Sequence, residues 1–109
     1  MWWHKAAEQG DANAAGMLGT LYERGLGFAQ DYAQAFVWYS RAAEKGLAPA
    51  QSLLGSLYQY GRGVPQDDAE AVFWYRKAAA QGFERAQQAL DNMLSRVGGM
   101  EHEATRSPL

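Results

Sequence analysis

The chain has 109 residues, of which 48% are hydrophobic and 20% are charged, and this size and composition predict one globular domain rather than two. Ten basic and twelve acidic side chains give a net charge of −2, so no surplus of positive charge can neutralise a row of phosphates, which argues against a nucleic acid partner. The absence of cysteine excludes disulfides, thiolate zinc sites and thiol nucleophiles.

Signals for membrane insertion or secretion are also missing from the sequence. No stretch approaches the roughly 18 consecutive apolar residues of a membrane-spanning helix. The opening residues MWWHKAAEQG lack the basic, apolar and small-residue order of a signal peptide. We therefore expect a soluble protein, cytoplasmic, or periplasmic or secreted if a signal peptide has been removed.

The sequence repeats itself with a period of 36 residues and without gaps. The period is marked by several sets of identical residues: Trp2, Trp38 and Trp74; Gly10, Gly46 and Gly82; Leu18-Gly19 and Leu54-Gly55; Gln30-Asp31 and Gln66-Asp67. A fixed period of this length predicts a repeat architecture in which each unit packs on the next.

In chain order, the pattern predicts six helices, over residues 1–9, 12–24, 31–45, 49–60, 67–81 and 84–97. Between residues 12 and 24, apolar side chains recur at helical spacing, which places Ala14, Met17, Leu18, Leu21 and Tyr22 on one face. The first helix of each pair is followed by a glycine-rich loop, which ends it.

The starts of the second helices carry a capping signal. Asp31 is followed three residues later by Gln34, and Asp67 by Glu70, which is the pattern of a capping box. The second helix of each pair therefore starts at the aspartate.

Two glycines lie inside predicted helices, where glycine costs about 1 kcal/mol relative to alanine. We expect Gly19 and Gly55 at points where another backbone comes too close for a Cβ atom. Opposite these glycines we expect a thin strip of small side chains on the second helices, formed by the alanine pairs Ala42-Ala43 and Ala78-Ala79. The aromatic residues that recur with the period are expected in the core.

These features predict an all-α fold, an α/α superhelical solenoid of antiparallel helix pairs. The predicted repeat domain covers residues 1–97, with a partial repeat at 1–10, full repeats at 11–46 and 47–82, and a polar capping helix at 83–97. Residues 98–109, which follow with Gly98-Gly99 and then without periodicity, are expected to be a disordered tail.

The repeat resembles the Sel-1-like repeat family, which is related to the tetratricopeptide repeats. The resemblance is carried by Ala50, Leu54-Gly55, Tyr58, Gly61-Arg62-Gly63-Val64, Asp67, Ala71, Trp74-Tyr75, Ala78-Ala79 and Gly82. It implies a right-handed superhelix that scaffolds protein complexes, mostly in bacteria, and no chemistry of its own.

Residues suited to catalysis or metal binding are scarce. His4 and His102 have no evident partners, and the run from Glu101 to Glu103 is interpreted as an incidental part of the tail. No phosphate loop, nucleophile elbow or His-Glu-x-x-His motif occurs. We predict no enzyme activity, no cofactor and no metal. Some cysteine-rich relatives are linked to β-lactam binding or hydrolysis, but this sequence lacks their cysteines and an activated serine.

Binding residues are expected where the repeats differ while the core positions stay fixed. In the related tetratricopeptide fold, the corresponding side of the first helices lines a concave groove for peptides. We therefore predict a protein or peptide partner there, with Tyr60 as an anchor; the alternative is an ordinary solvated face. The candidate residues are Asn13, Thr20, Glu23, Arg24, Ser52, Ser56, Gln59, Tyr60, Gln88 and Asn92.

The N-terminal edge carries Trp2 and Trp3 on a helix whose covering neighbour is absent from the sequence. Large exposed apolar patches usually mark contact sites. We therefore expect self-association through Trp2 and Trp3, and a purely structural or self-associating part of a longer array is the alternative to a binding module.

Overall fold

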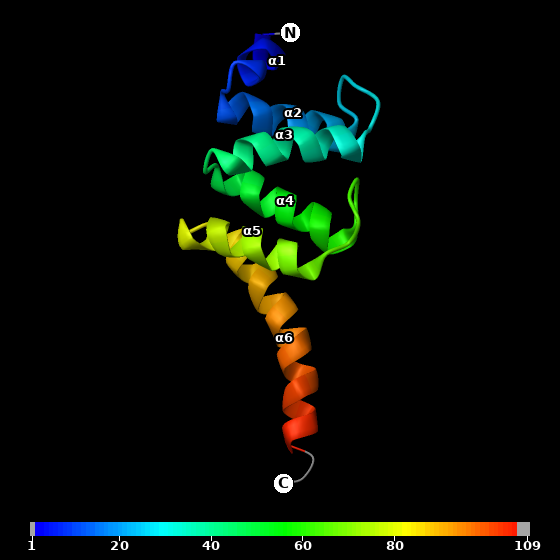
Figure 1. Ribbon diagram of the computed structural model, residues 1–109, viewed down its shortest axis with the longest axis vertical. Coiled ribbons are helices and arrows are strands. Elements are labelled where there is room, and N and C mark those ends of the chain that lie inside the picture. Colours follow the sequence, from blue (N-terminus) through cyan, green and yellow to red (C-terminus); the bar gives the residue numbers. More distant parts are fainter. Residues whose placement is uncertain (1, 107–109) are drawn as a thin grey trace.

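The computed structural model describes the backbone of residues 2–106 and the side chains of residues 5–95 (Figure 1). Over residues 2–106 it has six helices and no strand, which confirms the all-α prediction. The helices are α1 (Trp2–Glu8), α2 (Ala12–Arg24), α3 (Tyr32–Glu44), α4 (Ala48–Tyr60), α5 (Asp68–Ala80) and α6 (Glu84–Arg106).

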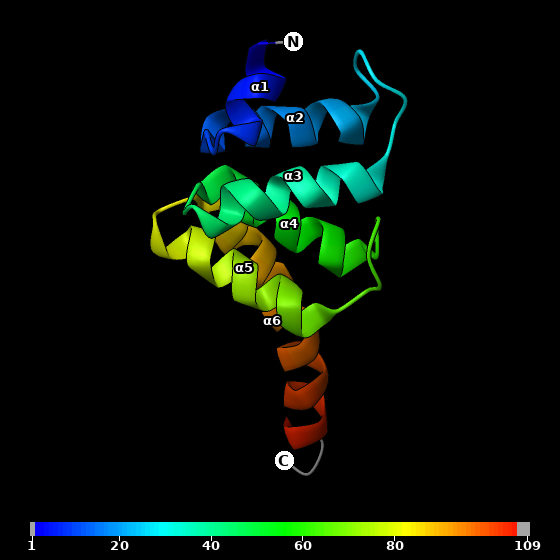
Figure 2. The same ribbon diagram turned by 45° about the horizontal axis from the view of Figure 1, so that its top comes forward.

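The helices stack into a solenoid along the long axis of the molecule. Each packs on its neighbour in the chain, and the pairs α2 with α3 and α4 with α5 have the most extensive contacts. In the view of Figure 2, α1, α3 and α5 form the layer nearer the viewer, and α2, α4 and α6 lie behind it. The first helices of the successive repeats therefore share one face of the molecule.

The predicted caps at both ends of the helices are present. Oδ1 of Asp31 accepts a hydrogen bond from the backbone N–H of Gln34, and Oδ1 of Asp67 accepts one from Glu70, each at 3.1 Å. Gly25 ends α2 in the left-handed conformation with φ of 69°, which a residue with a Cβ atom rarely adopts. The loop that follows turns the chain back into the antiparallel partner.

The helical glycines provide room for a tyrosine ring. A Cβ atom on Gly19 would lie 2.5 Å from Cδ1 of Tyr39, and one on Gly55 would lie 2.9 Å from Cδ1 of Tyr75. The expected close approach is confirmed, but at Gly19 the three nearest atoms belong to an aromatic ring rather than to a backbone, and at Gly55 the backbone carbonyl of Ala71 lies 3.2 Å away beside the ring.

The antiparallel direction of the two helices explains where the alanine strip lies. Ala42 is one turn beyond Tyr39 in α3, and its Cβ atom is 4.0 Å from the position of a Cβ atom on Gly16, one turn before Gly19 in α2. Of the alanine strip, Ala42 therefore faces Gly16.

The core is formed by the residues that recur with the repeat. Tyr39, Leu18, Leu54 and Leu57 are completely enclosed, and Trp38 is buried beside them. A second cluster joins α5 to α6 through Tyr75 and neighbouring apolar residues. The prediction that repeated aromatic residues pack in the core is confirmed at Trp38, Tyr39 and Tyr75.

Helix α6 closes the stack on α5. Ala86, Leu90 and Met93 are buried, while the exposed side chains between Glu84 and Ser95 are polar except for Leu94, which is 49% exposed. The helix was predicted to end at Val97, but its backbone is helical to Arg106. Glycine weakens a helix by about 1 kcal/mol per residue without breaking it, so Gly98-Gly99 can be accommodated. The division into a repeat domain and a tail from residue 98 stays a prediction.

Candidate functional site

The face shared by α2, α4 and α6 has two hollows. The first, the α2–α4 hollow, has a volume of about 370 Å³. Its walls are mainly apolar, with Met17 and Leu53 projecting from the two helices. It is lined by Asn13, Gly16, Met17, Thr20, Leu47, Pro49, Ala50 and Leu53.

The second, the α4–α6 hollow, has a volume of about 350 Å³ and more polar walls. Its most exposed aromatic side chain is Tyr60, which is 60% exposed, and the guanidinium of Arg62 lies 5.2 Å from the centre of the Tyr60 ring. The hollow is lined by Ser56, Gln59, Tyr60, Tyr75, Ala89 and Asn92.

Six of the ten residues predicted to bind a partner line these hollows. Asn13 and Thr20 lie in the α2–α4 hollow, and Ser56, Gln59, Tyr60 and Asn92 in the α4–α6 hollow. The other four line neither hollow: Ser52 is buried, Glu23 is half-buried, and Arg24 and Gln88 are exposed elsewhere on the helices.

Glu23 has a structural partner. The hydroxyl of Tyr39 donates a hydrogen bond of 2.7 Å to Oε1 of Glu23, and Oγ1 of Thr20 is 3.0 Å from the same hydroxyl. Burial, together with the hydrogen bond to Glu23, raises the pKa of Tyr39 above its usual range, so the hydroxyl stays protonated. Thr20 and Glu23 thus fix the tyrosine that packs on Gly19.

The next repeat keeps this arrangement. The hydroxyl of Tyr75 donates a hydrogen bond of 2.7 Å to Oε1 of Gln59. Burial and the neighbouring Tyr60 raise the pKa of Tyr75 to about 12, although the hydrogen bond with Ser56 acts in the opposite direction. Gln59 and Ser56 therefore support the fold as well as lining the α4–α6 hollow.

The apolar part of the candidate site was not predicted from the sequence. Met17 was placed on the buried face of its helix, but it is 52% exposed. It lies four residues after Asn13 and three before Thr20, so it belongs to the same stripe of the helix as these two. That spacing was the signal that could have placed Met17 at the candidate site. Because Met17 is apolar, it was assigned to the buried face instead.

Other predictions about sites receive no structural test. The side chains of Trp2 and Trp3 lie outside the described residues. Within the described part of the chain, no group of three or more His, Asp or Glu residues could hold a metal ion. No helix among the described residues is long and apolar enough to cross a membrane.

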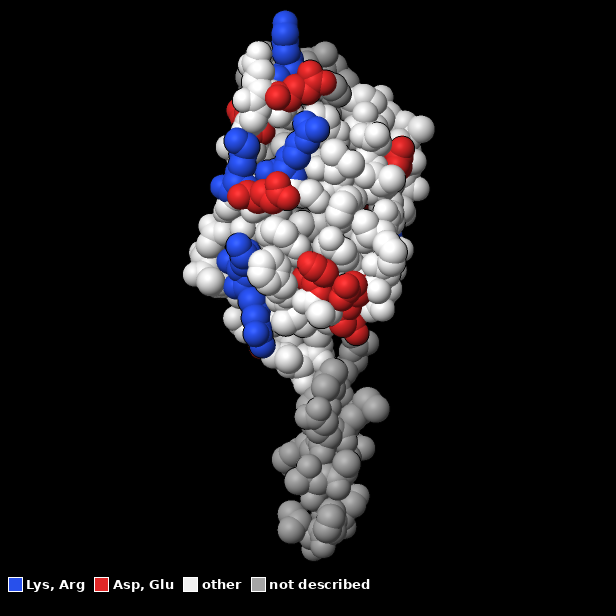
Figure 3. All heavy atoms as spheres, in the orientation of Figure 1, with Lys and Arg blue, Asp and Glu red and all other residues white. Residues whose placement is uncertain are grey.

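The face shown in Figure 3 carries both acidic and basic side chains. On the face shown in Figure 3, acidic and basic side chains alternate without a continuous patch of one sign.

Comparisons with solved structures identify several bacterial relatives. A protective antigen of uropathogenic Escherichia coli strains, which displays an SLR fold, is 47% identical with a TM-score of 0.85 over 87% of this chain, and the match covers 20% of the antigen's chain. A Sel1 repeat protein of Oxalobacter formigenes is 44% identical with a TM-score of 0.82, covering 84% of this chain and 68% of that one. Cysteine rich protein B of Helicobacter pylori is 30% identical with a TM-score of 0.77, covering 82% and 67%.

The comparison with curated proteins finds no match. The Sel1 repeat, in contrast, matches residues 1–11, 12–47 and 48–83, which include α1 to α5 and end before α6. Proteins with this repeat are generally non-catalytic scaffolds for protein interactions. The repeat of about 36 residues, the helical solenoid and these matches lead to one conclusion: the chain belongs to the Sel1 repeat family.

Proposed function

We propose that this protein is a non-catalytic interaction module that binds an extended peptide or a helix of another protein on the face of α2, α4 and α6. The observation that carries the proposal is the pair of hollows, because helix α4 contributes to both and they lie on successive helix pairs of one layer. Grooves with alternating apolar and polar pockets suit a partner segment that presents side chains in series.

The two hollows favour different side chains. Met17 and Leu53 in the α2–α4 hollow suit an aliphatic side chain, whose burial would remove apolar surface from water on both partners. The α4–α6 hollow combines the exposed ring of Tyr60 with amides of Gln59 and Asn92, and suits an aromatic or polar side chain. Tyrosine is among the residues that contribute most to binding energy at interfaces.

The test is selection of binding peptides from a displayed random library on the full chain, followed by affinity measurements on a selected peptide. Tyr60→Ala and Met17→Ser should each weaken binding by about tenfold or more, which corresponds to about 1.4 kcal/mol, with little change in melting temperature. Both side chains are at least half exposed, so the fold does not depend on them.

The matched control is Phe73→Ser on α5, because Phe73 is also half exposed, at 48%, but belongs to the other layer. It should bind the selected peptide like the wild type. Loss of binding in Phe73→Ser together with full binding by Tyr60→Ala and Met17→Ser would move the interaction to the opposite layer and refute the proposal.

A further inference from the structure

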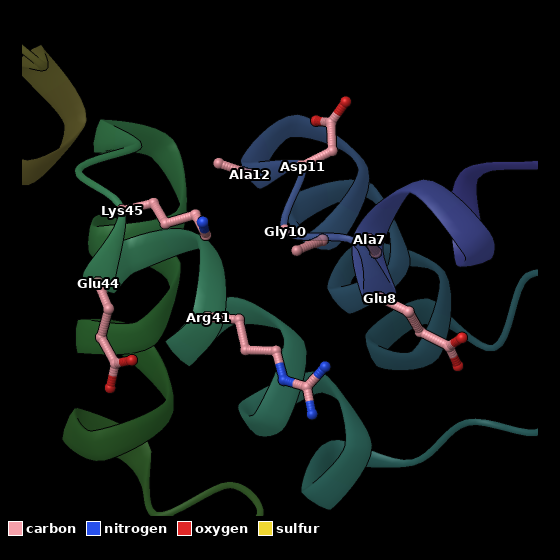
Figure 4. Close-up of a pocket in the computed structure, with 9 residues that line it drawn as sticks. Ala7, Glu8, Gly10, Asp11, Ala12, Arg41, Glu44 and Lys45 are labelled. Atoms are coloured by element: carbon pink, nitrogen blue, oxygen red, sulfur yellow. The ribbon is translucent and has the colours of Figure 1, made fainter.

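A third pocket, separate from the two hollows, lies between the junction of α1 with α2 and the C-terminal end of α3 (Figure 4). Its volume is about 180 Å³. The methyl groups of Ala7 and Ala15, which are 3% and 2% exposed, provide an apolar floor, and Ala12 lies beside them.

The next repeat shows why this space is open. The places that Ala15 and Lys45 occupy are taken one repeat later by Gln51 and Gln81. There the amide of Gln81 donates hydrogen bonds to the carbonyl of Gly46 at 2.8 Å and to Oε1 of Gln51 at 3.0 Å. Gln51 is buried and donates to the carbonyl of Ala43 at 3.1 Å. Two amides therefore fill the later interface.

In the earlier interface this pair is replaced by a methyl group and a cation. Lys45 is the C-cap residue of α3 and reaches back over Gly10, as Gln81 reaches back to Gly46. Its Nζ atom lies 3.0 Å from the position of a Cβ atom on Gly10. The volume that Gln51 would fill is left empty beside an ammonium group.

A second cation, Arg41, also lines this pocket. The guanidinium of Arg41 packs on the ring of Trp38, 4.6 Å from its centre, which fixes its position. In Figure 4 the side chain of Lys45 extends toward Gly10, whereas that of Arg41 runs along α3 and ends apart from Lys45. The carboxylates of the other lining residues point away from the space between the helices; these are Glu8, Asp11 and Glu44.

We propose that this pocket binds a small monocarboxylate, with the carboxylate held by Lys45 and a short apolar group on the alanine floor. An ammonium group forms charge-assisted hydrogen bonds with a carboxylate. A dianion such as phosphate meets about twice the repulsion from the three rim carboxylates that a monocarboxylate meets, and it has no apolar group for the alanine floor. The carboxylate can belong to a free acid or to the end of a peptide chain.

The test is titration of the ¹⁵N-labelled full chain with sodium propionate, followed by NMR. Propionate should shift the amide signals of Gly10 and Lys45 in a saturable way, with a dissociation constant on the order of 1 mM, as is usual for a ligand of few atoms. Propionamide has the same shape without the charge, and phosphate carries more charge. Both should bind at least about tenfold more weakly than propionate, a factor typical of one charged hydrogen bond.

A second pair of probes identifies the source of the carboxylate. Acetyl-alanyl-alanine with a free carboxylate is compared with its C-terminal amide. Tighter binding of the free peptide than of propionate assigns the pocket to a chain end, and binding of propionate alone assigns it to a free acid. Both results support carboxylate recognition, whereas equal binding of propionate and propionamide would overturn it.

The repeat itself supplies the variants. The double variant Ala15→Gln with Lys45→Gln copies the later interface, where two glutamines already pack together, so it should fold and lose the propionate shifts. The reverse double variant, Gln51→Ala with Gln81→Lys, should gain a second set of shifts around Gly46. Propionate binding that survives the first change, or no second site after the reverse change, would contradict the proposal.

Discussion

Adding one methyl group at Gly19 should destabilise the protein, although the same change favours the helix. Alanine in place of glycine inside a helix stabilises it by about 1 kcal/mol. Against this, the new Cβ atom would lie 2.5 Å, 2.6 Å and 3.0 Å from three atoms of the Tyr39 ring. The ring is enclosed, and its hydroxyl is held by Glu23 and Thr20, so it cannot turn away without losing these hydrogen bonds.

Overpacking of this kind costs about 1–3 kcal/mol, and three ring contacts place Gly19→Ala in the upper part of that range. We expect a net loss of about 1–2 kcal/mol after the helix gain is subtracted. The control is Gly16→Ala in the same helix, where the nearest atom, Cδ2 of Leu47 at 3.2 Å, is the end of a flexible side chain. Gly16→Ala should therefore be about 0.5 kcal/mol more stable than the wild type.

Urea unfolding followed by circular dichroism measures both variants. They should differ by about 2 kcal/mol, or roughly 10 °C in melting temperature for a domain of this size. Tyr39→Leu removes the ring, so the cost of Gly19→Ala should be much smaller in that background. Equal stability of Gly19→Ala and Gly16→Ala would refute the ring contact as the reason for the glycine.

Three further outcomes test the caps, the buried tyrosines and the N-terminal edge. Asp31→Ala should cost about 1 kcal/mol in urea unfolding, because the Gln34 N–H loses its acceptor, whereas Asp31→Asn should stay near the wild type. The pKa of Tyr75 is about 12 in the folded protein against 10.0 normally, so the unfolded chain loses this proton first as the pH rises. The free energy of unfolding should therefore fall between pH 10 and pH 12. Tyr75→Phe should reduce that fall, which urea midpoints measured across this pH range would show. Trp2→Ser with Trp3→Ser should convert a dimer into a monomer in sedimentation at micromolar concentration, and a wild type that is already monomeric would contradict self-association.

The fold was predictable because each repeated residue has a local role that its type reveals. Asp31 precedes a helical pattern and is followed three residues later by Gln34, which is typical of an N-cap, and Gly25 is favoured where the backbone turns left-handed. The ring that approaches Gly19 could not be predicted, since the glycine shows that space is needed without showing what occupies it. The end of α6 was also missed, because Gly98-Gly99 favours a helix end without enforcing it.

The candidate site was only partly predictable, because a difference between repeats does not by itself separate binding from support. Glu23 and Gln59 differ in charge, yet each presents an Oε1 atom that accepts a hydrogen bond from a tyrosine hydroxyl. The repeat therefore conserves an acceptor where the residue type changes. Met17 and Leu53 show the opposite case. They occupy the same position in successive repeats and both are apolar, yet both line a hollow on the surface.

The carboxylate pocket shows why two differences must be considered together. Ala15 and Lys45 are 30 residues apart, as are Gln51 and Gln81. The stacking of one repeat on the next places the two members of each pair at the same interface, where Gln51 and Gln81 form a hydrogen bond. An alanine opposite Gln81 would leave its amide without the Oε1 partner, and a lysine in place of Gln81 would remove the amide that donates to both Gly46 and Gln51. The pair of glutamines gives a filled interface, whereas the alanine with the lysine gives an open pocket with a cation at its edge. In a stack of similar repeats, the interface between two units can in this way carry a binding site that neither unit contains alone.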